Sequence, residues 1–121
     1  MKDAYLIIAH GSRERESNEA FFHLLERFRK AYPRRLIEGA FLELAEPGIP
    51  AAIKNCVAQG AKQVFILPLM MFPGRHVKQD IPRLIQDARA EYPDLDFHYA
   101  GPLCDHPGFV DFLEEKVKAL A

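Results

Sequence analysis

The stretch QVFILPLMMFPGRHVKQDIPRLIQDA, residues 63–88, decides the fold of this sequence. It begins with an almost unbroken apolar run over 63–71, which is typical of a strand that is buried on both faces of a parallel sheet. A polar loop follows, and apolar residues then recur over 81–88 at the spacing of one helical face. The stretch therefore predicts a strand, a loop and a helix, with the polar residues gathered just after the strand.

The same unit recurs along the chain. Three further segments, 4–9, 36–44 and 96–100, have the apolar, branched composition of strands. Three further helical stripes lie between or after them: Phe21, Leu24, Leu25 and Phe28; Ile49, Ala52, Ile53 and Cys56; and Val110, Leu113, Val117 and Leu120. Strict alternation of strand and helix predicts a single α/β domain over residues 1–121, with a four-stranded parallel sheet, helices on both faces and each stripe buried against the sheet.

Composition narrows the class of protein. The 121 residues are 49% hydrophobic and 27% charged, as in an ordinary globular domain, and the net charge of -1 gives no reason to expect a nucleic-acid partner. No apolar run has the length of a membrane span or of a signal-peptide core, so we expect no membrane partner and a cytoplasmic protein. Cys56 and Cys104 form no CxxC pair, so a disulfide scaffold is not expected.

Polar side chains concentrate in three loops that follow the first three strands: HGSRERES (10–17), ELAEPG (43–48) and FPGRHVKQD (72–80). Ligands of parallel α/β sheets bind beyond the carboxyl ends of the strands, so these loops are the candidate site. His10, Glu43 and His76 could converge there and hold zinc, iron, cobalt or nickel with positions left open. Taken singly, each histidine also fits a hydrogen-bonded loop residue, and Glu43 fits a solvated strand end.

Two interpretations of Asp80 remain open. It can be the N-cap of the helix that begins with Ile81 and Pro82, since Asp is a preferred capping residue. If the helix begins earlier, Asp80 lies one turn from His76 and can orient the imidazole through its second nitrogen. Gly74, two residues before His76, is expected to give the turn its conformational freedom.

Four cationic residues, Arg13, Arg15, Arg75 and Lys78, fall in the same loops. Together they predict a positive rim for a ligand with several carboxylates or phosphates, although each alone fits a solvated surface charge. The first loop contains neither GxGxxG nor GxxxxGK[ST], so a dinucleotide or P-loop site is not expected.

Three stretches, IIAHGSR (7–13), FLELAEPGIPAAI (41–53) and LPLMMFPGRHVKQDIP (67–82), resemble the small sirohydrochlorin chelatases. These enzymes insert cobalt, iron or nickel into a modified tetrapyrrole, in cobalamin, siroheme or coenzyme F430 biosynthesis. The resemblance implies a chelatase-like three-layer domain that pairs as a homodimer, with a divalent metal as substrate and no organic cofactor. It also implies that His10 and His76 bind the metal and serve catalysis, with Glu43 assisting.

The resemblance gives the loop residues a substrate as well. Sirohydrochlorin carries many carboxylates, and we assign its binding to Ser12 and to the cations Arg13, Arg75 and Lys78, with Arg15 on the same rim. Met70, Met71 and Phe72 can supply apolar surface to the flat macrocycle or can pack in the core. A carrier that holds a metal or tetrapyrrole without catalysis is the alternative function, and the sequence leaves the physiological metal open.

Overall fold

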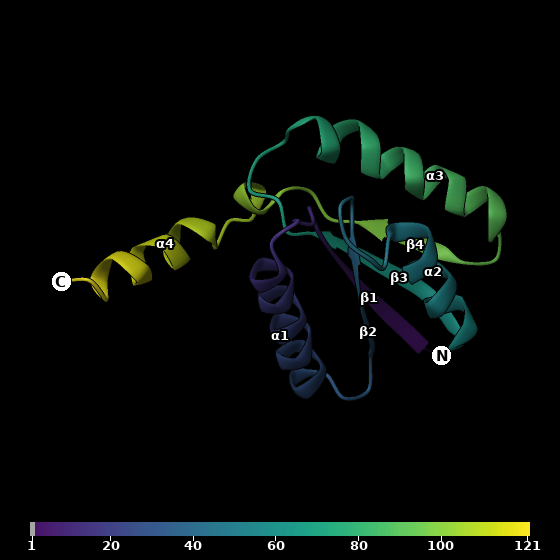
Figure 1. Cartoon of the computed structure of the whole chain (residues 1–121), viewed down its shortest axis with the longest axis horizontal. Helices are drawn as coiled ribbons and strands as arrows, with labels where there is room; N and C mark the ends of the chain where they lie inside the picture. The colour runs from purple at the N-terminus through teal and green to yellow at the C-terminus, as the bar shows by residue number, and fades with distance from the viewer. Residues whose placement is uncertain (1) are drawn as a thin grey trace.

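The computed structural model describes residues 2–121 and has the element order that the sequence predicts (Figure 1). The strands are β1 (Lys2–Ala9), β2 (Leu36–Phe41), β3 (Ala61–Pro68) and β4 (Asp96–Tyr99). The α-helices are α1 (Arg15–Ala31), α2 (Ile49–Ala58), α3 (Ile81–Glu91) and α4 (Phe109–Lys118). Two short segments complete the order, the π-helical turn η1 (His76–Asp80) and the 3-10 turn η2 (Leu103–Asp105).

The sheet is parallel throughout and has the order β2-β1-β3-β4. β1 is central, so that Ile7 lies opposite Gly39 of β2 on one side and Leu67 of β3 on the other. The carboxyl ends of β1, β2 and β3 therefore lie side by side at one edge of the sheet. The loops that carry the predicted site residues all leave from this edge.

Two strands end earlier than the sequence predicts. The strand expected over 36–44 ends at Phe41, and the one expected over 63–71 ends at Pro68. Leu44 has a φ of 66°, a left-handed conformation that no strand can continue through. The apolar residues beyond each strand thus belong to the loops of the site. Hydropathy alone could not show where each strand ends, because these loop residues are as apolar as the strand.

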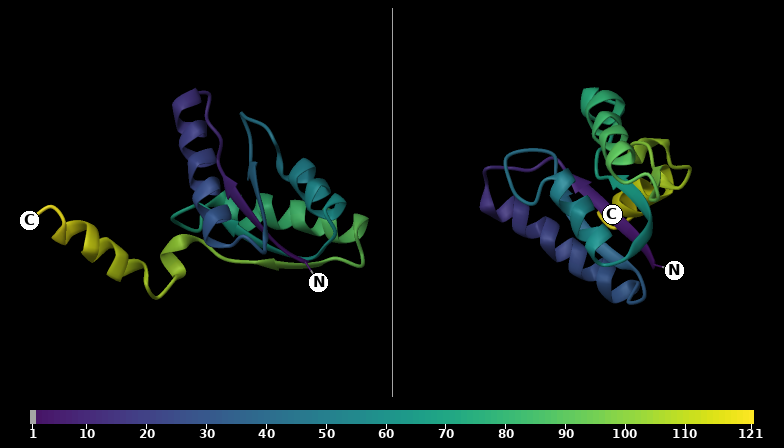
Figure 2. Two further views of the ribbon diagram at one scale, coloured as in Figure 1. Left: turned by 90° about the horizontal axis from the view of Figure 1, so that it is seen from below. Right: turned by 90° about the vertical axis from the view of Figure 1, so that its right-hand side faces the viewer.

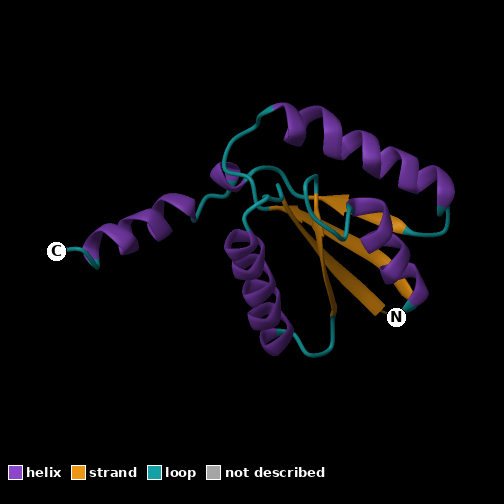
Figure 3. Cartoon of the chain, in the orientation of Figure 1, coloured by secondary structure: helices purple, strands orange, loops and turns teal. Residues whose placement is uncertain are grey.

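The faces of the sheet are covered unequally (Figure 3). α1 packs on one face, where its Phe21 and Leu25 join Ile7, Ile37 and Phe41 in a small core. It lies close because β2 has no side chain at Gly39: a Cβ there would stand 2.3 Å from Leu25 Cδ1. α2 and α3 pack on the opposite face over a larger core of the alternate strand residues.

α4 is the exception to the predicted burial. The stripe of Val110, Leu113, Val117 and Leu120 was expected to pack on the sheet, yet no residue of α4 is buried. Figure 2 shows the reason, since α4 leads away from the domain instead of folding back over it. Nowhere between Lys2 and Ala121 does a helix have the length and apolar character needed to cross a bilayer.

Candidate metal and tetrapyrrole site

His10 and His76 meet at the carboxyl edge of the sheet. His10 directly follows β1 and His76 is the first residue of η1, so adjacent strands bring the two side chains together. Their rings are 4.7 Å apart between centroids and nearly perpendicular, at 77°. His10 is exposed and His76 is half-buried, so the pair faces solvent. Two imidazoles in this arrangement can share a divalent ion that keeps open positions for a second ligand.

Asp80 holds the ring of His76. Its Oδ2 lies 2.6 Å from Nδ1 of His76, one turn earlier in the same helical segment. Because a carboxylate only accepts, Nδ1 carries the proton of a neutral ring, and the Nε2 lone pair is left for a metal or a substrate proton. Asp80 makes no side-chain capping hydrogen bond, and the helical backbone begins at His76. Of the two interpretations of Asp80, the structure therefore selects the orienting role over the cap.

η1 is a π-helical turn, in which the backbone N–H of Ile81 donates to the carbonyl of His76. Such turns are uncommon and frequently occur at functional sites. The Tyr99 hydroxyl donates to the carbonyl of Val77 at 3.0 Å and fixes the turn from β4. Burial raises the pKa of Tyr99, so the hydroxyl keeps its donor proton. No sequence pattern indicates this hydrogen bond, because Tyr99 lies on a distant strand.

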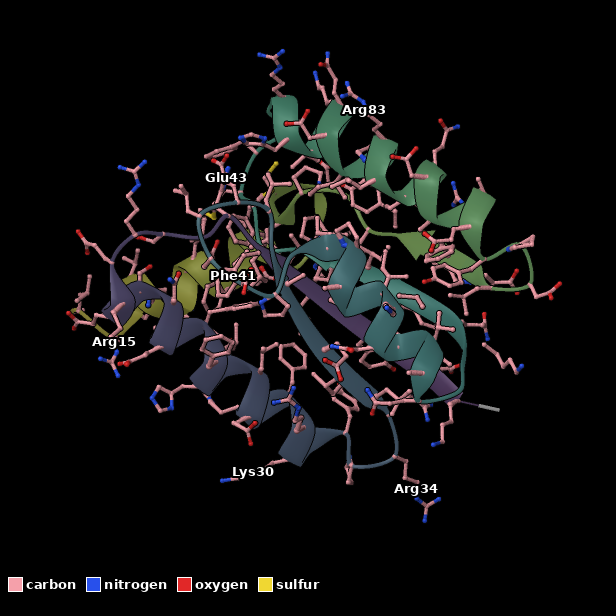
Figure 4. The ribbon with its side chains drawn as sticks, turned by 45° about the vertical axis from the view of Figure 1, so that its right-hand side comes forward. Arg15, Lys30, Arg34, Phe41, Glu43 and Arg83 are labelled. Carbon is pink, nitrogen blue, oxygen red and sulfur yellow. The ribbon has the colours of Figure 1, made fainter. Side chains whose placement is uncertain are left out.

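Glu43 contacts His10 through its backbone. Its N–H donates to the carbonyl of His10 at 3.1 Å, and its own carbonyl would stand 1.8 Å from a Cβ at residue 11, where Gly11 has a φ of 95°. The Glu43 side chain is exposed on the loop after β2 (Figure 4). Among residues 2–121, no three His, Cys, Asp or Glu side chains come close enough to hold a metal. The structure thus brings His10 and His76 together, and the Glu43 carboxylate stays outside that pair.

Asn18 fixes the loop that contains Ser12 and was missed by sequence reasoning. Its side-chain oxygen accepts from the Ser12 N–H at 3.1 Å, and its amide donates to the Ser12 carbonyl at 2.8 Å. The Ser12 hydroxyl itself accepts from the Glu14 N–H at 3.0 Å. An Asn in the first turn of a helix that follows a polar loop was the available signal.

The predicted cations divide into two groups. Arg15 is paired with Glu19 at 2.8 Å on the first turn of α1. Arg13, Arg75 and Lys78 are exposed and have no acidic partner within the described part of the chain. These three charges remain available to an anionic ligand at the edge that carries the histidines.

Apolar side chains also reach the surface in these loops. Met71, Phe72 and Leu44 are exposed, whereas Met70 is buried in the core. Of the three residues expected either to pack in the core or to offer apolar surface to the macrocycle, Met70 packs in the core, and Met71 and Phe72 face solvent. Gly74, by contrast, has no positive φ, and nothing lies within 4 Å of a Cβ at that position. The expectation that this turn needs the freedom of glycine is wrong.

Comparison with known proteins identifies the family of this chain. The model of the CbiX family matches residues 4–120. A chloroplastic sirohydrochlorin ferrochelatase of Arabidopsis thaliana is 38% identical over 116 residues, which are 96% of this chain and 52% of that protein. A sirohydrochlorin cobaltochelatase of Sulfolobus acidocaldarius is 32% identical over 96% of this chain and 91% of its own length. The chain spans about half the length or less of several of its curated relatives.

Solved structures show the same fold. The sirohydrochlorin chelatase SirB from Bacillus subtilis subspecies spizizenii, in complex with cobalt, matches with a TM-score of 0.87 at 32% identity, over all of this chain and 52% of that one. A CbiX protein from Marinobacter aquaeolei VT8 matches with a TM-score of 0.83 at 27% identity, over 97% of this chain and 95% of that one. The predicted α/β fold and the predicted resemblance are confirmed, and the chain belongs to the CbiX family.

Proposed function

We propose that this protein is a sirohydrochlorin chelatase, which inserts a divalent metal into sirohydrochlorin and releases the two protons of the macrocycle's N–H groups. The observation that carries the proposal is the pair of imidazoles 4.7 Å apart at the ligand-binding edge of the sheet. Membership of the CbiX family supports it, because relatives of this chain are named sirohydrochlorin ferrochelatase and cobaltochelatase.

The two imidazoles can serve both steps of the reaction, which are the transfer of the metal and the removal of the protons. A divalent ion held by two neutral nitrogen ligands keeps water or substrate in its other positions, so it can pass to the macrocycle as its pyrrole nitrogens replace the protein ligands. The released protons need a base that works near neutral pH, and a neutral imidazole can serve as that base. Asp80 keeps Nε2 of His76 directed to this task. We assign His10 and His76 each as a metal ligand and as a base in turn, and Glu43 as a third ligand that joins them when its exposed side chain turns inward.

The substrate fits the surface around the pair. Carboxylates of the tetrapyrrole would bind Arg13, Arg75 and Lys78, with the Ser12 loop beside them. The exposed Met71 and Phe72 offer apolar contact to the macrocycle. The metal is a substrate here, and the chemistry asks for no organic cofactor. We further propose a homodimer in the cytoplasm, the latter because both Cys56 and Cys104 are free thiols, as expected in a reducing compartment.

An anaerobic absorbance time course tests the function. Sirohydrochlorin is mixed with cobalt, ferrous iron or nickel and a trace of protein, beside His10→Ala and a His23→Ala control on the exposed side of α1. Many turnovers that His10→Ala abolishes and His23→Ala retains are expected, and the ranking of the metals indicates the pathway. Metallation that stops at one equivalent of protein would identify a carrier, and no rate above the spontaneous reaction would overturn the proposal.

A further inference from the structure

The helical segment that carries His76 has a proline in its interior. The backbone is helical from Arg75 onward, with φ and ψ of -56° and -42° there and of -69° and -49° at Asp80, so Pro82 lies about two turns inside it. A proline within a helix lacks the N–H that would donate to the carbonyl four residues earlier, and its ring collides with that carbonyl. The carbonyl belongs to Lys78, in the middle of η1. A regular α-helix therefore cannot run through η1 without a broken hydrogen bond.

The π-helical form of η1 moves the broken hydrogen bond to another carbonyl. The N–H of Ile81, which would donate to Val77 in an α-helix, donates instead to the carbonyl of His76. In the same π pattern the Val77 carbonyl would need an N–H from Pro82, which has none. Lys78 is exposed, so water can reach its carbonyl, but Val77 is buried. A buried carbonyl needs a partner within the protein.

Tyr99 supplies the missing donor from β4. Its hydroxyl donates to the Val77 carbonyl at 3.0 Å. A few residues further along, the N–H of Leu103 donates to the carbonyl of Met70 at 2.8 Å. The end of β4 and the segment after it thus brace both ends of the loop that leads from β3 to His76.

The π-turn decides where the His76 side chain points. Ile81, Ile85 and Ala88 are buried in the core and fix the rotation of α3 about its own axis. A π-turn holds one residue more than an α-turn, so an α-turn in its place would rotate the preceding residues by about 100° relative to α3. His76 would then lose its approach to the ring of His10, which is now 4.7 Å away between centroids.

We infer that Pro82 and Tyr99 are positioning residues of the proposed metal site. Pro82 imposes the π-turn, and Tyr99 satisfies the carbonyl that this turn leaves without a partner. The turn in its stabilised form directs His76 towards His10. Both residues act through the backbone of η1 and not as metal ligands. The inference rests on the proposed function, because it takes metal binding by the two imidazoles as the property that the turn serves.

The affinity of the folded protein for Co²⁺ alone, measured by titration calorimetry, gives the first test. Tyr99→Phe keeps the ring and removes only the donor to Val77, so the affinity is expected to fall about tenfold, as when other groups that orient a metal ligand are lost. Tyr32→Phe removes the same hydroxyl from a tyrosine that is 47% exposed, and this control should bind like the wild type. A Tyr99→Phe protein that melts earlier but binds Co²⁺ with unchanged affinity would overturn the inference, because the tyrosine would then only stabilise the fold.

Pro82→Ala separates positioning from stability. The alanine restores an N–H for the carbonyl of Lys78 and permits a regular α-helix, in which the Ile81 N–H returns to Val77. Pro82→Ala, alone and together with Tyr99→Phe, is therefore expected to melt no lower than the wild type and yet to bind Co²⁺ about tenfold more weakly. Wild-type affinity in either protein, or a lower affinity that comes with a lower melting temperature, would overturn the inference.

These titrations are independent of the chelatase assay, because they contain no tetrapyrrole. A wild type that binds Co²⁺ more tightly than the Pro82→Ala and Tyr99→Phe proteins, but inserts no metal, would refute only the chelatase function. An active chelatase whose variants bind Co²⁺ as tightly as the wild type would refute only the inference. A wild type without measurable affinity for Co²⁺ would also overturn the inference, since the turn would then serve no metal site.

Discussion

The imidazole rings of His10 and His76 meet nearly at right angles with a centroid distance of 4.7 Å, although the two residues belong to different loops. The relationship depends on β1 and β3 being neighbours in the sheet and on Asp80 fixing one of the two rings. Single substitutions can remove either ring or the Asp80 carboxylate, and the expected consequences differ.

Loss of either imidazole should stop insertion without unfolding the protein. His10→Ala and His76→Ala are each expected to lower kcat/KM for metal insertion by about 10²–10⁴, the usual contribution of a positioned acid–base group. Neither side chain belongs to the buried core, so thermal unfolding should change little. Steady-state kinetics and a melting curve measure both, with His23→Ala as the control. Full activity in either variant would contradict the assignment.

Asp80 should act on the chemistry and not on the helix. Asp80→Asn keeps the shape but weakens the hold on His76, and a loss of about 10- to 100-fold in metal affinity or rate is expected, as for other carboxylates that orient a ligand. Stability should stay within about 0.5 kcal/mol, because the side chain caps no backbone N–H. Asp87→Asn, an exposed position on α3, is the matched control. A destabilised variant with normal kinetics would restore the capping role.

Two glycines at the site should respond differently to the same change. Gly11→Ala places a methyl group 1.8 Å from the Glu43 carbonyl oxygen at a φ of 95°, so at least about 2 kcal/mol of unfolding free energy should be lost. Gly74→Ala meets nothing within 4 Å and should stay within about 0.5 kcal/mol. Urea unfolding compares them, and equal losses would show that the contact between the first two loops is not what requires glycine.

The free cations should affect substrate binding more than turnover. Arg75→Ala and Lys78→Ala are expected to raise KM for the tetrapyrrole several-fold with little change in kcat, since a carboxylate far from the pyrrole nitrogens binds equally in ground and transition states. The effect should shrink as salt rises, because exposed charges are screened. Lys54→Ala, an exposed position on α2, is the control. A fall in kcat at unchanged KM would place these residues in the chemistry instead.

The fold should weaken in alkali through a buried thiol. Burial raises the pKa of Cys56 from 9.0 to about 12, so the folded protein keeps a proton that the unfolded chain releases. The stabilising contribution is complete below pH 9 and declines as the pH rises towards 12, by about 1–2 kcal/mol at pH 10.5 for this group. Urea unfolding under reducing conditions at pH 8 and 10.5 measures the decline, and Cys56→Ala should show a smaller one. An equal decline in both proteins would assign it to other groups.

The sequence was sufficient to predict the strands and helices whose formation depends on apolar packing alone. Unbroken apolar runs and helical stripes predict β1, β3 and the three buried helices, because the apolar residues that form each pattern are the residues that the fold buries. The meeting of His10 with His76 also follows from strand order, once both lie at the carboxyl ends of neighbouring strands. Tyr99 could not be assigned, since it acts through a hydrogen bond to the backbone of a distant segment that no pattern identifies. Asn18 could have been assigned, because its place in the first turn of a helix after a polar loop is a recognisable signal.

α4 marks the limit of pattern reading most clearly. Its stripe is correct for a buried helix, and periodicity says that a face must be covered without saying which surface covers it. The same limit applies to Glu43: strand order brings its backbone beside His10, but the direction of a surface carboxylate depends on what binds it. Sequence periodicity does not determine the contacts of side chains whose positions depend on a ligand or on a second chain.

The central position of β1 has a consequence for how the protein is made. His10 leaves the ribosome early, but its partner imidazole comes into place only when β3 has been synthesised and has paired with β1. Until then the proposed chelating pair of His10 and His76 is not assembled, so a nascent chain lacks the proposed site for cobalt or iron. Metal that binds only the finished sheet adds its binding free energy to folding. Under the proposed function, metal would therefore stabilise the chains that have completed their sheet.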